Sequence, residues 1–79
     1  MVTLDRLVPG QKGTIQSINA SPVILQRLLE MGLLEGEEVE VITIAPFGDP
    51  IDLRIHGFQL SIRKSEASAI QVKPFGEST

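Results

Sequence analysis

Four glutamates close together in the sequence are the residues whose type and spacing most suggest metal chemistry. They are Glu35, Glu37, Glu38 and Glu40. Hard divalent cations take carboxylate oxygens as ligands, and Glu38 and Glu40 would share one face of a strand. A metal site, however, usually draws its ligands from several elements and holds them with further hydrogen bonds. The pattern therefore favours a solvated acidic face, and we expect neither a metal site nor a cofactor site.

The groups that catalysis requires are not gathered in this sequence. His56 is the only histidine, and its place before Gly57 favours a tight turn, where histidine tolerates left-handed backbone better than most residues. Serine chemistry needs a base, an orienting acid and an oxyanion site, and no such set stands out. The chain also has no GxxxxGK[ST] motif for GTP hydrolysis of the P-loop type. We predict that the protein is not an enzyme.

Three arginines keep one catalytic alternative open. Arg27, Arg54 or Arg63 could stabilise the transferring phosphoryl group of a partner as an arginine finger. Most domains carry a few exposed arginines, so their presence alone is weak support. Activation of a partner's GTPase therefore stays an alternative to simple binding.

A proline-bracketed loop over residues 45–51 is the strongest candidate for partner binding. Each proline fixes φ at about −65°, and the glycine between them supplies a conformation that other residues avoid. The aromatic ring at the tip would thus be presented rigidly, which lowers the entropic cost of binding. The alternative is a rigid connection whose ring folds back on the core. The candidate loop residues are Pro46, Phe47, Gly48, Asp49 and Pro50.

Residues 22–31 form the one clear predicted helix. Ser21 is a good N-cap, Pro22 suits the first helical position, and Gly32 suits a left-handed C-cap. At about 100° per residue, one broad apolar stripe contains Ile24, Leu25, Leu28, Leu29 and Met31. The stripe predicts burial for most of its members, while its margins and the polar side remain available to a partner. The candidate helix residues for partner binding are Val23, Arg27, Leu29 and Met31.

Alternating apolar residues predict about five short strands around this helix. They cover residues 13–18, 39–45, 51–55, 58–62 and 70–72, with a short helical turn over 64–69. The alternation slips at Ile42, which predicts a bulge or a bend there. A two-residue turn at His56-Gly57 would pair Ile55 with Phe58, Leu53 with Leu60 and Ile51 with Ile62, all on one face. We therefore predict a mainly β fold, a small antiparallel barrel whose open end is capped by the inserted helix.

The length of 79 residues predicts a single domain over residues 1–75, followed by a loose tail at 76–79. The chain has no cysteine, no apparent export signal and no run approaching about 18 apolar residues, so we expect a cytoplasmic protein that does not insert into a membrane. A net charge of −3 argues against a nucleic-acid partner, because nucleic-acid binding depends on a basic footprint.

Three blocks of the sequence together resemble the FeoA family. They are residues 27–33, residues 45–51 and residues 57–67 with Leu60-Ser61-Ile62-Arg63-Lys64 inside, and they extend across nearly the whole chain. The resemblance implies an SH3-like barrel and a cytoplasmic accessory role in ferrous iron uptake, through contact with the cytosolic GTPase-bearing region of the FeoB-type transporter. One departure is Phe47, where leucine is commoner in the family.

Two other interpretations stay open. The same barrel resembles the C-terminal domain of iron-dependent repressors of the DtxR type, which would make this chain a regulatory module. A repressor also needs a DNA-reading helical domain, and this sequence shows none. Unpaired edge strands in addition leave weak self-association open.

Overall fold

Short strands alternate with short helices along the chain. In the computed structural model, which describes residues 1–76, strand β1 (Val2–Thr3) and the 3-10 helix η1 (Leu4–Arg6) precede β2 (Lys12–Ile18) and helix α1 (Pro22–Glu30). Strands β3 (Glu38–Ile44), β4 (Ile51–Ile55) and β5 (Phe58–Ile62) follow, and helix α2 (Lys64–Ala67) leads into β6 (Ile70–Pro74). Every predicted element forms, with its ends shifted by at most two residues.

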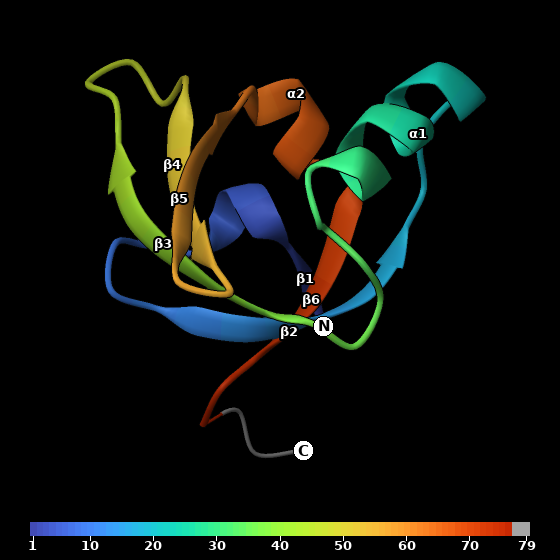
Figure 1. Ribbon diagram of the computed structural model, residues 1–79. Coiled ribbons are helices and arrows are strands. Elements are labelled where there is room, and N and C mark those ends of the chain that lie inside the picture. The colour runs from blue at the N-terminus through green and yellow to red at the C-terminus, as the bar shows by residue number, and fades with distance from the viewer. Residues whose placement is uncertain (77–79) are drawn as a thin grey trace.

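The six strands of the described residues join in one antiparallel sheet, in the order β1-β6-β2-β3-β4-β5. The sheet curves around the core, and α1, α2 and the β3–β4 loop lie together at the upper end of the view in Figure 1. The predicted mainly β antiparallel class is confirmed. The prediction of about five strands omits β1, because two residues are too few to show an alternation.

The core lies inside the curve of the sheet. Its buried apolar side chains come from β2 to β6, from all three helices and from two connecting segments. They are Leu4, Leu7, Ile15, Leu28, Leu33, Val39, Val41, Ile51, Leu53, Ile55, Ile62, Ala67, Ile70 and Val72. Helices α1 and α2 at the upper end are each anchored in this core by a fully buried side chain, Leu28 and Ala67 respectively.

Strand β3 contains the predicted irregularity. Val41 pairs with Leu53 but Thr43 pairs with Asp52, so Ile42 is the extra residue of a bulge. A bulge bends its strand and re-aims the side chains beyond it. At Ile42 the alternation of inward and outward side chains therefore shifts by one residue, and β3 bends towards the loop at residues 45–50.

The β4–β5 hairpin has the predicted register in full. Ile55 pairs with Phe58, Leu53 with Leu60 and Ile51 with Ile62. Positive φ angles of 52° at His56 and 79° at Gly57 fit a tight turn, which confirms the turn role of the histidine. A shared face does not mean equal burial, because Phe58 is 73% exposed whereas its partner Ile55 is buried. The hairpin tip extends beyond the core, so of the pair next to the turn only Ile55 is covered and the Phe58 ring is left exposed.

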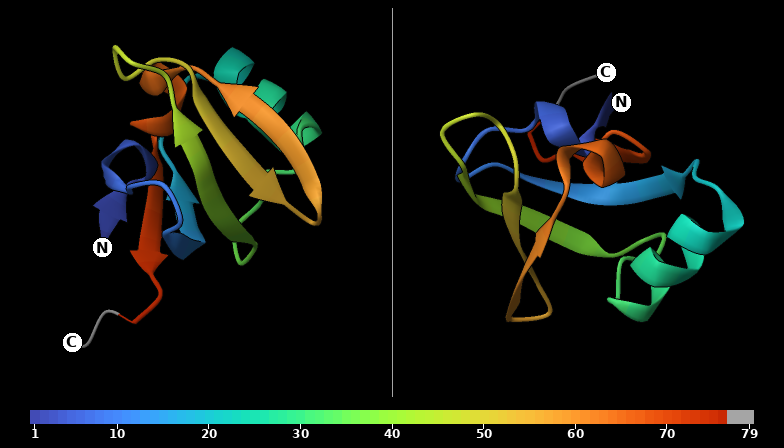
Figure 2. Two further views of the ribbon diagram at one scale, coloured as in Figure 1. Left: turned by 90° about the vertical axis from the view of Figure 1, so that its left-hand side faces the viewer. Right: turned by 90° about the horizontal axis from the view of Figure 1, so that it is seen from above.

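Helix α1 begins and ends as predicted. The Ser21 hydroxyl oxygen accepts a hydrogen bond of 3.5 Å from the Ile24 N–H, and Gly32 follows the helix with a φ of 93°. The apolar stripe is only partly buried, since Leu28 is covered completely while Leu29 is 41% exposed. The helix lies at the periphery of the molecule (Figure 2), which leaves part of its apolar surface uncovered.

Two further predictions concern membrane-spanning segments and the C-terminal tail. Among residues 1–76, no helix has the length and apolar character that crossing a membrane requires. The predicted loose tail at 76–79 lies, apart from Gly76, outside the described residues, and together with the single domain at 1–75 it stays a prediction.

Candidate functional site

The loop at residues 45–50 presents an almost fully exposed phenylalanine. Phe47 is 98% exposed, so its ring does not fold back on the core. The Gly48 N–H donates a hydrogen bond of 2.7 Å to the Ala45 carbonyl, and the Ala45 N–H donates one of 3.0 Å to the Pro50 carbonyl. Gly48 has a φ of 86°, and the Asp49–Pro50 peptide bond is cis. The loop is therefore closed by its own backbone with the ring at its tip.

A hydrogen bond connects this loop to α2. The Lys64 N–H donates to Asp49 Oδ1 at 3.0 Å, so the carboxylate satisfies one of the free backbone donors at the start of the helix. Lys64 Nζ also lies beside the loop, 4.0 Å from the point where a Cβ on Gly48 would be. The charge of Lys64 is thereby placed next to the loop at Gly48.

A buried carboxylate connects α2 to α1. The Glu66 side chain is 4% exposed, and its Oε2 lies 3.4 Å from Arg27 Nη1. Its Oε1 accepts a hydrogen bond of 2.8 Å from the Arg63 N–H. Oε2 has no hydrogen-bond donor in the described structure, so the Arg27 contact is a charge pairing without hydrogen-bond geometry. The Arg27 side chain remains 55% exposed, so one side of the guanidinium meets Glu66 and the rest meets solvent.

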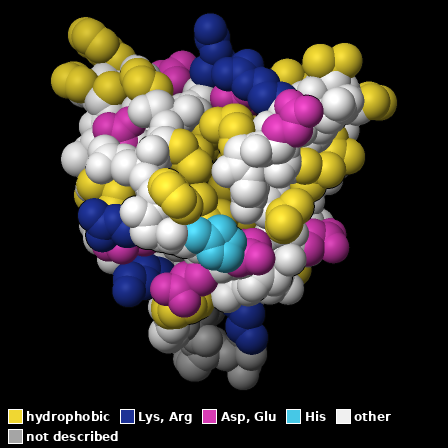
Figure 3. All heavy atoms as spheres, in the orientation of Figure 1, with side chains coloured by type: hydrophobic (Ala, Val, Ile, Leu, Met, Phe, Trp, Pro, Cys, Tyr) yellow, Lys and Arg dark blue, Asp and Glu magenta, His cyan; other side chains and the backbone are white. Residues whose placement is uncertain are grey.

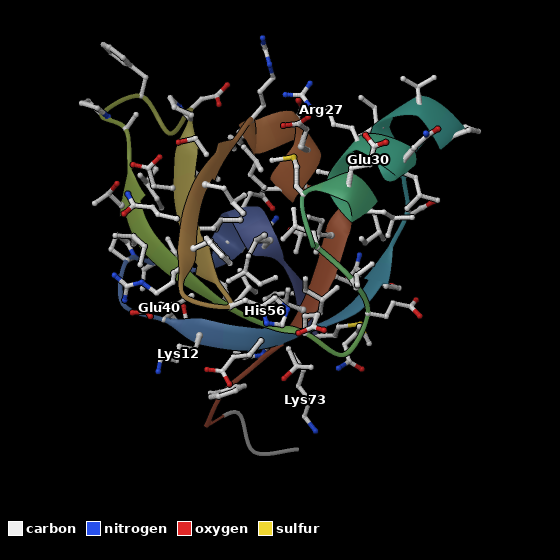
Figure 4. The ribbon with its side chains drawn as sticks, in the orientation of Figure 1. Lys12, Arg27, Glu30, Glu40, His56 and Lys73 are labelled. Atoms are coloured by element: carbon white, nitrogen blue, oxygen red, sulfur yellow. The ribbon has the colours of Figure 1, made fainter. Side chains whose placement is uncertain are left out.

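We call the surface formed by residues 45–50, Arg63, α2, Val23 and Arg27 the loop-helix surface. Val23 is 78% exposed near the start of α1. Figure 3 shows hydrophobic side chains at both sides of this upper end, with lysine and arginine side chains between them. Figure 4 shows Arg27 reaching from α1 towards α2. The arrangement combines exposed apolar groups with positive charge, which suits binding of another molecule.

The remaining candidate residues of the helix lie elsewhere. Leu29 lines a hollow of about 320 Å³ with Ile18, Leu25 and Leu34, on a different side of α1. Met31 is the C-cap residue and packs against the core. The structure therefore groups Val23, Arg27 and the five loop residues, and it places Leu29 and Met31 outside that group.

The four glutamates that suggested metal chemistry mostly pair with basic side chains. Glu37 Oε2 lies 2.8 Å from His56 Nε2, Glu38 lies 3.9 Å from Lys12, and Glu40 lies 3.5 Å from Arg54. These pairs line a hollow of about 450 Å³ below the hairpin tip, around the labelled Lys12, Glu40 and His56 of Figure 4. Within residues 1–76, no group of three or more His, Asp or Glu side chains is placed to hold a metal ion.

Asp52 is a second polar centre that no sequence pattern indicated. Its carboxylate accepts a hydrogen bond of 2.8 Å from the Thr43 hydroxyl on β3 and another from the Ser61 hydroxyl on β5. These two bonds, that from Ser61 first, lower the pKa of Asp52 below its ordinary value, because they favour the charged form. Asp52 therefore joins three neighbouring strands on the outer face of the sheet.

The sequence analysis missed Glu66 and Lys64 as part of the site. A glutamate three residues after an N-cap is the second half of a capping box, but the N-cap here is Arg63 and not serine or threonine. The burial of Glu66 depends on Arg27, which lies 39 positions earlier and on another helix. The spacing from Arg63 to Glu66 is the only local signal that could have indicated the contact.

Solved structures with the same fold include two FeoA proteins. The FeoA protein of Chlorobium tepidum is 32% identical, with a TM-score of 0.89 over 99% of this chain and 74% of that chain. Stenotrophomonas maltophilia FeoA, solved with zinc, is 28% identical, with a TM-score of 0.80 over 92% of this chain and 91% of that chain. It is described as a prokaryotic SH3 domain protein and suggested to act as a ferrous iron transport activating factor. The SH3-like fold is thus confirmed.

A manganese-dependent transcriptional repressor has the same fold. It is 23% identical, with a TM-score of 0.88 over 94% of this chain and 41% of that chain. At this identity the likeness concerns the fold alone.

Sequence comparison gives the family. A Porphyromonas gingivalis protein named as a fusion of Fe(2+) transport protein A and the Fe(2+) transporter FeoB is 33% identical over 89% of this chain. The chain spans only 8% of that fusion protein's length. The sequence pattern of the FeoA domain matches residues 2–74, nearly the whole of the described structure. The family's association with ferrous iron transport thus agrees with the resemblance seen in the sequence, and this chain belongs to the FeoA domain family.

Proposed function

We propose that this protein is a cytoplasmic, non-enzymatic accessory protein of ferrous iron uptake that binds the cytosolic GTPase-bearing region of an FeoB-type transporter. The observation that carries the proposal is the P. gingivalis relative, in which an FeoA part and an FeoB part share one chain. Fusion keeps two domains at high effective concentration, which favours domains that act together. Where the two parts are not fused, the same partnership needs a binding surface.

The loop-helix surface is the best candidate for that contact. Its two most exposed apolar groups, Phe47 and Val23, stand at either side of α2, and the loop is held by its own hydrogen bonds and by Asp49. Such a surface loses little conformational freedom on binding. Aromatic anchors of this kind commonly dominate an interface.

Calorimetry on the purified cytosolic region of the same organism's transporter tests the proposal, with GDP and with a non-hydrolysable GTP analogue. We expect saturable binding, weakened by about 2 kcal/mol in Phe47→Ala. Phe75→Ala is the matched control, because Phe75 is half-exposed near the C-terminal end of the chain and should leave affinity unchanged. Absence of binding in both nucleotide states at high micromolar concentration would refute the proposal.

The geometry of Arg27 supports a second candidate function, activation of the partner's GTPase. Its guanidinium is oriented by the buried Glu66 and is half-exposed, which suits the stabilisation of phosphoryl charge. The measurement is GTP turnover by the transporter region, with and without this protein. Stimulation that is lost in Arg27→Lys while binding persists would favour activation over simple docking. Unchanged turnover would leave docking alone.

A further inference from the structure

We propose that the loop-helix surface recognises an acidic segment of its partner that carries apolar residues on both sides of its carboxylates. Arg27, Arg63 and Lys64 supply the positive charge, and Phe47 and Val23 supply the apolar contacts. The inference rests on the proposed function, because it names the chemistry of the partner's contact surface.

Three basic side chains gather at this end of the molecule. Arg27, Arg63 and Lys64 are three of only seven lysines and arginines in a chain of net charge −3. All three lie on or beside α2, where Arg63 is the N-cap, Lys64 is the first helical residue and Arg27 contacts Glu66. Figure 3 shows lysine and arginine side chains at the centre of this end. An acidic partner segment would meet three neighbouring basic side chains here.

Among the described residues, three carboxylates lie at this end, those of Glu30 (beside Arg27 in Figure 4), Asp49 and Glu66, and only Glu66 forms an ion pair with one of the three basic side chains. Glu66 is buried behind Arg27, and Asp49 is engaged by the Lys64 N–H. Arg63 and Lys64 are exposed, and neither side chain forms an ion pair with the described residues. By contrast, Lys12, Arg54 and His56 each face a glutamate around the hollow below the hairpin tip. The free positive charge therefore lies on the loop-helix surface and not around that hollow.

Arg27 is prepared to bind a carboxylate. A guanidinium carries five N–H donors in a rigid fork, and the Glu66 contact through Nη1 holds one side of it. The exposed side of the guanidinium can donate two parallel hydrogen bonds to a carboxylate, and the Arg27 side chain has little conformational entropy left to lose on binding. A lysine at this position would keep the charge but lose the paired geometry.

The exposed apolar groups indicate which kind of residue should flank the acidic residues of the partner segment. The Lys64 ammonium lies beside Gly48, the residue after Phe47, and Val23 lies on the same helix as Arg27, four positions earlier. Residues four apart on a helix are neighbours on its surface. Arg27 thus has an exposed apolar neighbour on its helix, and Lys64 lies against the loop that carries Phe47, so we infer a segment with apolar residues on both sides of its acidic ones.

The test measures association of this protein with the cytosolic region of the same organism's transporter, at about 50 mM and about 500 mM salt. The variant Arg63→Glu/Lys64→Glu reverses two exposed charges. The control Lys12→Glu/Lys73→Glu makes the same change in net charge at the lower end of the molecule in Figure 4. We expect the first variant to slow association about tenfold at low salt and to reduce its salt dependence, because rim charges act mainly on association rate. The control should keep the rate near that of the wild type.

Three results would overturn the inference and leave the proposed function intact: equal rates for the two double variants, binding that is insensitive to salt, or a charge effect seen only with the GTP analogue. The last would place the recognised anion on the nucleotide. Arg27→Lys adds an independent check, since dissociation should be faster with little change in association rate. If the wild type fails to bind in any nucleotide state, the proposed function itself is wrong and the inference falls with it.

Discussion

Glu66 is a buried charge whose neighbours affect the stability of the fold. Its carboxylate is buried and depends on the Arg63 N–H and on the charge of Arg27. We expect Arg27→Ala to lower the free energy of unfolding by about 1–2 kcal/mol, because a buried charge loses its partner while Arg27 itself is partly screened by solvent. Urea unfolding measures the change. Arg54→Ala is the control, since its pair with Glu40 is more exposed and should contribute less than about 0.5 kcal/mol.

Asp52 makes the fold sensitive to acid. The hydroxyls of Ser61 and Thr43 lower its pKa in the folded state. The ionised carboxylate therefore stabilises the fold above its unfolded pKa of about 3.9, and this contribution is lost as the pH falls through the folded-state pKa. An NMR titration of the Asp52 carboxyl carbon should give a pKa below 3.9. In Thr43→Val/Ser61→Ala the pKa should move back up, whereas Gln59→Ala should leave it unchanged; an ordinary pKa in the wild type would contradict this account.

Single residues were predicted well where the signal is local. The turn role of His56 follows from its neighbour Gly57, and the exposure of Val23 follows from its position on the helix. The role of Glu66 could not be read in the same way, because its burial arises where two helices meet. Phe58 shows the converse, since a correct register does not reveal how far a hairpin extends beyond the core.

At the scale of elements, the β3–β4 loop depends on α2 for its position. Asp49 is the connecting residue, through its bond to the Lys64 N–H. We expect Asp49→Ala to free the loop, which should appear as reduced heteronuclear NOE values over residues 46–49 and a loss of about 0.5–1 kcal/mol in stability. Asp49→Asn keeps an acceptor oxygen and should retain most of the order. Equal NOE values in wild type and Asp49→Ala would show that the prolines alone fix the loop.

Strands β2 and β6 approach each other closely at Gly13. A Cβ at this position would lie 3.1 Å from the Lys73 carbonyl oxygen and 3.4 Å from Val72 Cβ. Because the nearer atom belongs to the backbone, the two strands would have to separate slightly. We expect Gly13→Ala to destabilise the protein by about 1 kcal/mol in urea unfolding. Gln16→Ala, an exposed change on the same strand, is the control, and a stabilised Gly13→Ala would disprove the close-approach argument.

Most elements could be predicted because their signals are local and consistent. The Ser21, Pro22 and Gly32 signals fixed the limits of α1, and the alternation on both sides of His56-Gly57 fixed the hairpin register. Strand β1 was missed because its two residues form a strand only by pairing with β6, far along the chain. The loop-helix surface was predicted in part, since the loop was recognised but its connection to α2 was not.

At the scale of the whole molecule, the sheet has two ends of different character. Strand β1 is a two-residue edge next to β6, whereas β5 is a five-residue edge that pairs only with β4. The β5 sequence contains no charge and no proline, the usual protections of an edge strand. The sheet is therefore expected to be most stable in its middle strands and least stable at the β5 edge.

Hydrogen exchange would reveal this gradient. In a hairpin closed by a two-residue turn, Ile55 and Phe58 form the first hydrogen-bonded pair, so the N–H groups of Leu60 and Ile62 face β4 and those of Gln59 and Ser61 face away from it. We expect the Gln59 and Ser61 amides to exchange rapidly, and the Ile15 and Val41 amides on the middle strands β2 and β3 to exchange slowest, near the global unfolding limit. Native-state exchange followed by NMR makes the comparison within one sample. Strong protection of both edge amides at high protein concentration that disappears on dilution would mean that a second molecule covers β5, and protection independent of concentration would contradict the open edge itself.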